Sequence, residues 1–364
     1  MKKIYILLLY LVVSIIPVFA QQSEQSLIKE GVALHDKGEY KQAIEKYREA
    51  LKINPKSTSA TYEMSLTYLE MKDYRNASKF STQVINSNDK ALSVGAYCVK
   101  SEAIAEMGNI DEAIKVLQDG IRKNGDQYLL HFNMALNYYK KNDLQNTLVH
   151  VKRAIDLSKT YSGAFLLNSY ALKDTGLWVQ SILSAQMFLL LEPDSRRSKN
   201  AFEEMLQTML VKPKTETPVE RSFIQQQLYR NNPKPTISPN DIPPLSIEEG
   251  LNRNLVYHAV KTTLDSIKTT KDADNQYITF TEVNKAILTL LAKENNGNKE
   301  ETTFWNFYVP FFTEILQSDY YDTYCRYISV SYFPESLEWW NNNKEEARKF
   351  LNWFEHGDNK PAKK

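Results

Sequence analysis

Residues 26–55 read SLIKEGVALHDKGEYKQAIEKYREALKINP, and they decide how the following two hundred residues are expected to fold. Gly38 lies in a turn between two segments with helical patterning. Small residues at Gly31 and Ala43 let two antiparallel helices approach closely, and Tyr47 fills the space beside them. Pro55 cannot continue the second helix. The stretch therefore predicts one helix–turn–helix unit.

The same spacing returns along the chain with a period of about 34 residues. Steps forward from Ala43 reach a small residue each time, at Ala77, Ala113, Thr147 and Ser181. Two other positions of the first unit also recur, since Ala154 repeats Ala50 and Pro193 repeats Pro55. Larger or more flexible residues replace Ala50 in three units, at Val84, Gly120 and Phe188. Five units keep the period, so we expect five helix pairs.

This pattern resembles the tetratricopeptide repeat (TPR). The residues that carry the resemblance and define the repeats are Gly31, Ala43, Tyr47, Ala50, Pro55, Ala77, Ala113, Ala154 and Pro193. The resemblance implies an all-α fold, in which a TPR superhelix of about five repeats is followed by a C-terminal helical region. The array is expected over residues 24–210, with a capping helix at 201–210.

In TPR arrays the first helix of each pair lines a concave face, and the resemblance places the peptide-groove candidates there. They are Tyr62, Leu66, Glu102, Phe132, Leu136, Tyr139, Tyr170 and Lys173. The same face includes Ile28, Val32, His35, Leu69, Cys98 and Leu166, with Glu70 and Glu106 beside Glu102. Ile28 and Val32 stand where related arrays grip a terminal carboxylate, so that binding mode is not expected. The alternative is that the aromatic residues pack between helices or against the C-terminal region.

The first twenty residues are expected to be a secretory signal peptide. Lys2 and Lys3 precede an apolar run from Ile4 to Ile16, and Pro17 and Ala20 lead to the cleavage point. The run is short for a membrane span, although an uncleaved anchor is the alternative. We expect export to the periplasm or outer membrane of a Gram-negative bacterium, or secretion, with membrane contact only through the signal peptide at 1–20.

A Pro-rich linker is expected at 211–245, followed by an aromatic-rich helical region at 246–364. Ser246 with Glu249 resembles a capping box that opens a helix reaching residue 268. Further helices are expected at 281–294, 303–317, 320–331 and 336–354. The crowded aromatics predict a packed core, and the alternative is a sugar-binding site that includes Trp339 and Trp340.

No catalytic or metal-binding pattern stands out. Residues 272–283 resemble a calcium loop, but the aspartates are out of register, so an Asp-capped loop between helices is expected. The five histidines are dispersed, and none pairs with another at the spacing of metal ligands. Cys98 and Cys325 are either free thiols or one disulfide. We therefore expect no enzyme activity, no metal and no cofactor.

The composition narrows the partner. Lys plus Arg number 45 against 44 for Asp plus Glu, a net charge of +1, which argues against nucleic acid. The leading hypothesis is an exported, non-catalytic scaffold or adaptor that binds a protein or peptide in its groove. The alternative is a carbohydrate-binding envelope protein, similar to SusD-type glycan-capture proteins, that uses the C-terminal aromatics. A hydrolase within 246–364 is a third possibility. The partner's identity and the oligomeric state stay open.

Overall fold

The computed structural model describes residues 23–210, 247–248, 250–296 and 302–356. The chain divides into two compact units, a first unit up to Val116 and a second unit from Leu117 onward. The expected signal peptide at 1–20 and the Pro-rich linker at 211–245 lie outside the described residues. Within the described residues, no helix has both the length and the apolar content that crossing a membrane requires.

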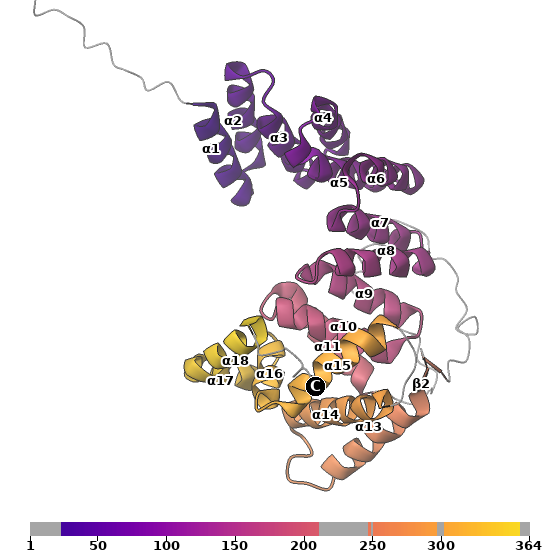
Figure 1. Cartoon of the computed structure of the whole chain (residues 1–364). Helices are drawn as coiled ribbons and strands as arrows, with labels where there is room; N and C mark the ends of the chain where they lie inside the picture. The colour runs from indigo at the N-terminus through magenta and orange to yellow at the C-terminus, as the bar shows by residue number, and fades with distance from the viewer. Residues whose placement is uncertain (1–22, 211–246, 249, 297–301, 357–364) are drawn as a thin grey trace, which may run out of the picture. The chain divides into compact units, whose positions relative to one another are not determined.

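The repeat region forms five helix pairs (Figure 1). They are α1 (Glu24–Asp36) with α2 (Tyr40–Ile53), α3 (Thr58–Glu70) with α4 (Tyr74–Ser87), α5 (Lys90–Glu106) with α6 (Ile110–Asn124), α7 (Tyr128–Lys140) with α8 (Leu144–Leu157), and α9 (Ser162–Asp174) with α10 (Trp178–Leu191). The helix α11 (Arg196–Met209) follows where a capping helix was predicted. The predicted all-α fold of helix–turn–helix repeats is confirmed.

Every pair turns in the same way. In the first turn the N–H of Gly38 donates to the carbonyl of His35 at 2.8 Å, and the N–H of Glu39 donates to Leu34 at 2.9 Å. This pair of bonds recurs in the other four turns and satisfies the last carbonyls of each first helix. The central residue always has a left-handed φ, 79° at Gly38, 60° at Lys72, 91° at Gly108, 62° at Asn142 and 82° at Gly176. The repeat thus keeps this turn conformation even at Lys72 and Asn142, where glycine is absent.

The small residues let the helices of a pair approach. Ala43, Ala77 and Ala113 are fully buried. A Cβ at Gly31 would lie 2.3 Å from Cε1 of Tyr47, so only glycine fits beside that ring. At two of the serines that replace this glycine, the hydroxyl bridges the two helices: Ser101 Oγ donates to the carbonyl of Ala113 and Ser169 Oγ to that of Ser181, each at 3.0 Å. Ser65 instead donates to the carbonyl of Tyr62 in its own helix. Close packing therefore depends on side-chain size at these positions.

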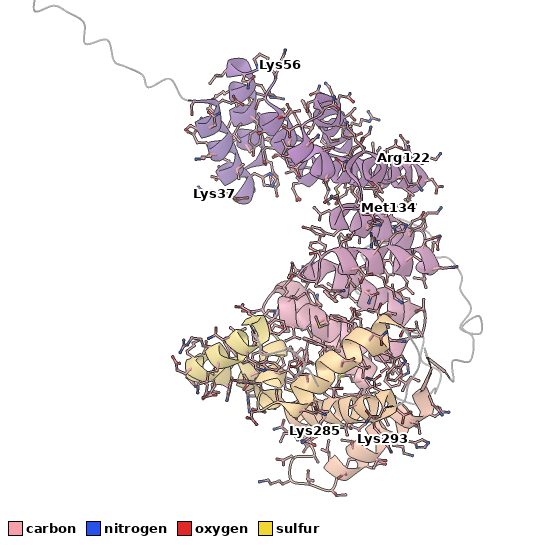
Figure 2. The ribbon with its side chains drawn as sticks, viewed as in Figure 1. Lys37, Lys56, Arg122, Met134, Lys285 and Lys293 are labelled. Atoms are coloured by element: carbon pink, nitrogen blue, oxygen red, sulfur yellow. The ribbon has the colours of Figure 1, made fainter. Side chains whose placement is uncertain are left out.

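The C-terminal region contains a short hairpin and several helices. These are β1 (Ile247–Glu248), β2 (Leu251–Asn252), α13 (Arg253–Ile267), α14 (Gln276–Asn295), the π-helix η3 (Phe304–Tyr308), α15 (Val309–Gln317), α16 (Tyr321–Ile328), α17 (Pro334–Asn342) and α18 (Lys344–His356). The strands are antiparallel, with Glu248 opposite Leu251. In α14, Lys285 and Lys293 are exposed (Figure 2), whereas Ile287 and Leu291 are buried.

Four predicted helix boundaries in this region are wrong, and one of them is the start of α14, which begins at Gln276 rather than at residue 281. The first helix begins at Arg253 rather than at residue 246, because Gly250 adopts φ 80° and turns the chain into the hairpin. Asn252 caps that helix in place of the expected pair, since its side chain accepts from the N–H of Asn254. Ser246 and Glu249 lie outside the described residues.

The remaining two errors concern helices that end early. The helix expected at 320–331 ends at Ile328, and Pro334 begins α17 as its first residue. The helix expected at 336–354 is interrupted at Asn343, whose backbone leaves the helical region and forms the C-terminal cap of α17. Two short helices therefore replace the single long one.

The second unit is built around α10. All residues from Val179 to Leu190 are buried, as expected for a mainly apolar helix that has no charged residue. The helix α10 packs against α9 and α11, and also against η3 and α16 of the C-terminal region. One continuous core reaches from Ala135 to Phe350, so the C-terminal helices belong to the same folded unit as the last repeats.

A buried polar network fixes α10 against the C-terminal helices. Gln186 Nε2 donates to Asn284 Oδ1 of α14 at 2.8 Å, and the hydroxyl of Tyr324 in α16 donates to Gln186 Oε1. All three side chains are fully buried. Buried polar groups are costly when unpaired, so this network favours one docking arrangement over others.

Replacement of Gln186 by Leu should show how strongly the stability of the chain depends on this network. The change leaves Asn284 and Tyr324 with unsatisfied polar atoms, so we expect the free energy of unfolding to fall by about 1–3 kcal/mol. Urea denaturation of the full chain measures it, with Gln207→Leu on the exposed side of α11 as the matched control. Equal unfolding midpoints for the two variants would contradict the proposed role of the network.

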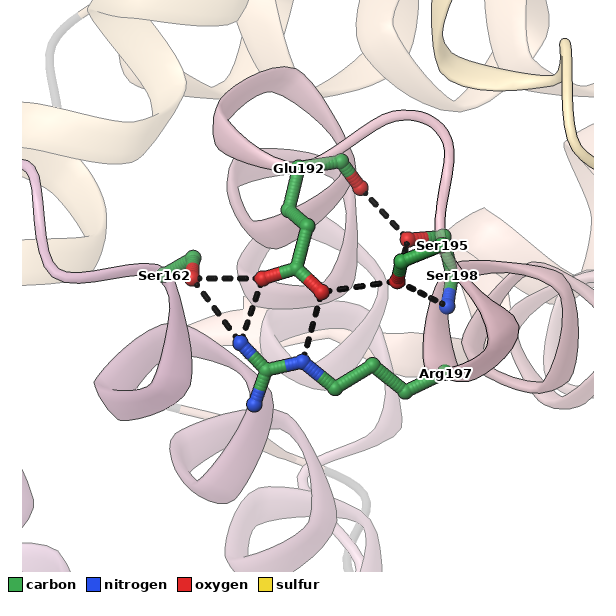
Figure 3. A network of polar contacts seen from close by, with 5 residues as sticks. All are labelled: Ser162, Glu192, Ser195, Arg197 and Ser198. Carbon is green, nitrogen blue, oxygen red and sulfur yellow. Dashed lines mark hydrogen bonds and ion pairs between the residues drawn. The ribbon is translucent and has the colours of Figure 1, made fainter. Parts of the chain in front are cut away.

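A second polar network joins the ends of three helices (Figure 3). Glu192, at the end of α10, accepts from Ser195 Oγ at 2.7 Å and from Ser162 Oγ at 2.9 Å. The guanidinium of Arg197 donates to both carboxylate oxygens, with Nε at 2.6 Å from Oε1. Ser198 Oγ donates to the carbonyl of Glu192 at 2.7 Å. The hydrogen bonds from Arg197, above all, lower the pKa of Glu192 to about 2.

This pKa predicts an acid-dependent contribution to stability. The folded-state pKa lies below the ordinary value of 4.5, so the stabilisation is complete above that value and is lost as pH falls towards about 2. We expect Glu192→Gln to destabilise the chain by about 1–2 kcal/mol at neutral pH, and by less as pH falls from about 5 to about 3. Denaturant titrations at each pH test this, with Glu203→Gln as an exposed control. A difference that is constant across pH would refute the assignment.

Candidate functional site

The predicted groove residues fall into two sets, one in each unit. In the first unit Tyr62 and Leu66 of α3 are half-buried, and Glu102 of α5 is exposed. In the second unit Phe132, Leu136 and Lys173 are partly buried, whereas Tyr139 and Tyr170 are buried. The two sets therefore differ in what a partner can reach.

The first helices of the first unit carry a strip of half-exposed apolar side chains. We call it the first-helix surface, and it consists of Ile28, Val32, Tyr62, Leu66, Leu69 and Cys98. The first five of these pack by one side against the core formed by α2, α3, α4 and α5. Their other side remains accessible, which is the arrangement that a docking surface requires.

Tyr62 connects two of these helices. A Cβ at Gly95 would lie 2.3 Å from the Tyr62 hydroxyl, so the ring lies across the bare backbone of α5. Burial raises the pKa of Tyr62, with smaller contributions from Glu63 and Cys98. The side chain is thus a fixed part of the surface, positioned by a glycine.

Acidic residues border the strip. Asp36, Glu70, Glu102 and Glu106 are exposed on the three first helices. Glu63 lies deeper, near His35 and Asp36, and burial raises its pKa. Burial, with the charge of Glu102, raises the pKa of the Cys98 thiol to about 12, so the thiol stays protonated and is a poor nucleophile. The first-helix surface, with its acidic border, therefore has the character of a site that binds an apolar segment.

In the second unit, two predicted groove tyrosines are not available to a partner. The hydroxyl of Tyr139 donates to Asp174 Oδ2 at 2.6 Å, and only 2% of the side chain is exposed. Tyr170 lies in the core formed with α11, where burial raises its pKa. Lys173 Nζ lies 3.5 Å from Glu204 Oε2 of α11. The helix α11 therefore occupies the position that the sequence assigned to a ligand.

Phe132 and Leu136 also serve packing. The ring of Phe132 meets Tyr161 edge to face, with ring centres 4.9 Å apart, and both Phe132 and Leu136 pack against the core. Burial argues against a groove role for Tyr139 and Tyr170, whereas Phe132 and Leu136 are partly exposed and stay groove candidates. The alternative of packing between helices describes Tyr139 and Tyr170.

One histidine pair was missed from the sequence. His131 of α7 and His150 of α8 lie with their Nδ1 atoms 2.9 Å apart, because the two helices are antiparallel neighbours. The ring centres are 5.2 Å apart. This separation equals the contact between the two nitrogens plus the radius of each ring, so the two Nδ1 atoms point directly at each other. To bind one metal ion, the lone pairs of both nitrogens would have to point to a common position beside the line that joins them. The geometry suits one shared proton, and Asp126 accepts at the other nitrogen of His131.

The C-terminal aromatics mainly form core. Trp305, Phe312 and Tyr324 are buried in the second unit. Trp339 and Trp340 are half-buried, and the guanidinium of Arg326 lies 5.4 Å from the ring centre of Trp339. The sequence predicted a packed core here, and the structure confirms it for most of the cluster.

The structure also bears on the expectations for residues 272–283 and for the two cysteines. The stretch at 272–283 is mostly helix, since α14 begins at Gln276, and its cap is Asn275 rather than the expected aspartate. Cys98 and Cys325 are both free thiols, which decides between the two alternatives left open.

Comparison with known proteins gives one family match and several structural likenesses. Residues 31–80 match the model of the TPR repeat. No curated protein matches the chain. Among solved structures, the thermophilic TPR protein TTC0263 of Thermus thermophilus is 22% identical, with 52% of this chain and 100% of that chain covered and a TM-score of 0.45.

Two others are similarly distant. PilF of Pseudomonas aeruginosa is 14% identical, with 50% of this chain and 83% of that chain covered and a TM-score of 0.43. A TPR protein of Parabacteroides merdae ATCC 43184 is 16% identical, with coverage of 51% and 71% and a TM-score of 0.44. The family match, together with the turn that all five helix pairs share, supports a tetratricopeptide-repeat protein.

Proposed function

We propose that the protein is a non-catalytic binding scaffold, which holds a segment of a partner protein on the first-helix surface. The TPR fold suggests a protein–protein interaction scaffold. The observation that carries the proposal is the strip of half-exposed apolar side chains, including Val32, Leu66 and Leu69, on consecutive first helices. Such a strip gains free energy when a partner's apolar side chains remove it from water.

The proposal narrows the original groove to its first half. Tyr139 and Tyr170 are excluded because they are buried within their own unit. Export to the cell envelope is part of the proposal and rests on the charged and apolar pattern of residues 1–20. The carbohydrate-binding alternative stays a prediction for Trp339 and Trp340.

Substitution of the apolar strip tests the function. The triple variant Val32→Ser, Leu66→Ser and Leu69→Ser changes half-exposed side chains, so it should remove binding without unfolding the chain. We expect recovery of specific partners from an envelope extract, quantified by mass spectrometry, to fall about tenfold or more. Circular dichroism and the midpoint of thermal unfolding check that the fold is retained.

A matched control separates the site from general surface hydrophobicity. Ile53, Val149 and Leu255 are exposed by 47%, 57% and 40% and lie outside the first-helix surface. Their replacement by Ser should leave partner recovery unchanged. If the variant of the strip and this control recover the same partners in equal amounts, the first-helix surface is not the binding site.

A further inference from the structure

The border of the first-helix surface has a negative charge that the whole chain lacks. The same repeat positions of α1, α3 and α5 hold twelve residues, which are Ile28, Val32, His35, Asp36, Tyr62, Leu66, Leu69, Glu70, Cys98, Glu102, Ala105 and Glu106. Four of these are acidic, and none is Lys or Arg. The full chain is nearly neutral, with a net charge of +1, so the acidic character is local.

Contacts between neighbouring helices bring charged side chains of this border close together. His35 of α1 lies with its Nδ1 atom 2.8 Å from Thr67 Oγ1 of α3, which places the end of α1 beside Glu63. Burial raises the pKa of Glu63, and the charge of Asp36 raises it further, whereas His35 opposes the shift. The end of α1 thus lies close enough to α3 for the charges of His35 and Asp36 to act on Glu63.

A second contact at this border joins α4 to α5. The hydroxyl of Tyr74 lies 3.5 Å from Glu106 Oε2, and burial together with the charges of Glu106 and Glu102 raises the pKa of Tyr74. A cation brought to this border would be attracted by the exposed carboxylates of Glu70, Glu102 and Glu106. An anion would be repelled by them, and negative side chains are therefore selected against.

Resting on the proposed function, we propose that the bound segment is basic and apolar, with Lys or Arg side chains placed between apolar ones. The apolar side chains cover Val32, Leu66 and Leu69, and the cations lie against Glu70, Glu102 and Glu106. Each exposed ion pair contributes little by itself, so the acidic border acts mainly on partner choice and association rate. Binding should therefore weaken as salt is added.

Selection from a random peptide library identifies the preferred chemistry without a known partner. A display library of peptides of about twelve residues is selected on the chain without residues 1–20. Clones are counted only if they fail to bind the Val32→Ser, Leu66→Ser and Leu69→Ser variant. We expect Lys plus Arg to be enriched about twofold or more over the unselected library, and Asp plus Glu to be depleted.

Charge variants then test the mechanism on one selected peptide. The triple variant Glu70→Gln, Glu102→Gln and Glu106→Gln should bind it about tenfold more weakly at low salt, with the difference shrinking as salt rises from about 50 to about 500 mM. The control Glu39→Gln, Glu112→Gln and Glu338→Gln removes the same charge from exposed positions elsewhere and should have no such effect.

The outcomes separate the two proposals. Peptides that need the apolar strip but are not enriched in Lys and Arg would overturn the basic partner and retain the binding function. Equal effects of the two charge variants would likewise overturn it, because the net charge alone would then explain binding. If no selected peptide depends on the apolar strip, the proposed function fails together with this inference.

Discussion

The enclosure of α10 on every side is the constraint on which the second unit depends. Every residue from Val179 to Leu190 is buried, and such a helix is stable only when other elements cover its whole circumference. The helices α9 and α11 cover part of it, while η3 and α16 cover another part through the network of Gln186. The C-terminal helices are therefore part of the fold of the last repeats, and α11 closes over Tyr170.

The first unit uses the same repeat differently. Its helix pairs have the same turns and the same small buried residues, but Val32, Leu66 and Leu69 remain half-exposed on the first helices. The acidic residues gather on those helices as well, although the chain is neutral as a whole. One repeat architecture thus supplies a covered half, which gives stability, and an open half with an apolar strip and a defined charge.

Much of the fold follows from local sequence, whereas the accessibility of the site does not. The 34-residue period predicted five pairs because it reports the turn and the small residues of each unit. The burial of Tyr139 and Tyr170 depends on Asp174 and on α11. No local sequence pattern around those tyrosines predicts these contacts. A usable signal was present in α10, because its segment WVQSILSAQMFLLL has no charged residue and is therefore expected to be covered by other elements. The pairing of His131 with His150 likewise needs the geometry of two antiparallel helices.

The central claim is that Tyr62 of the first unit is accessible, whereas the predicted groove tyrosines of the second unit, Tyr139 and Tyr170, are enclosed. Hydroxyl-radical footprinting of the free chain tests it directly, because Tyr62, Tyr139 and Tyr170 share one intrinsic reactivity and differ only in accessibility. The account predicts that Tyr62 is oxidised several times faster than Tyr139 and Tyr170, which are exposed by only 2% and 4%. Similar oxidation rates at all three tyrosines would contradict it.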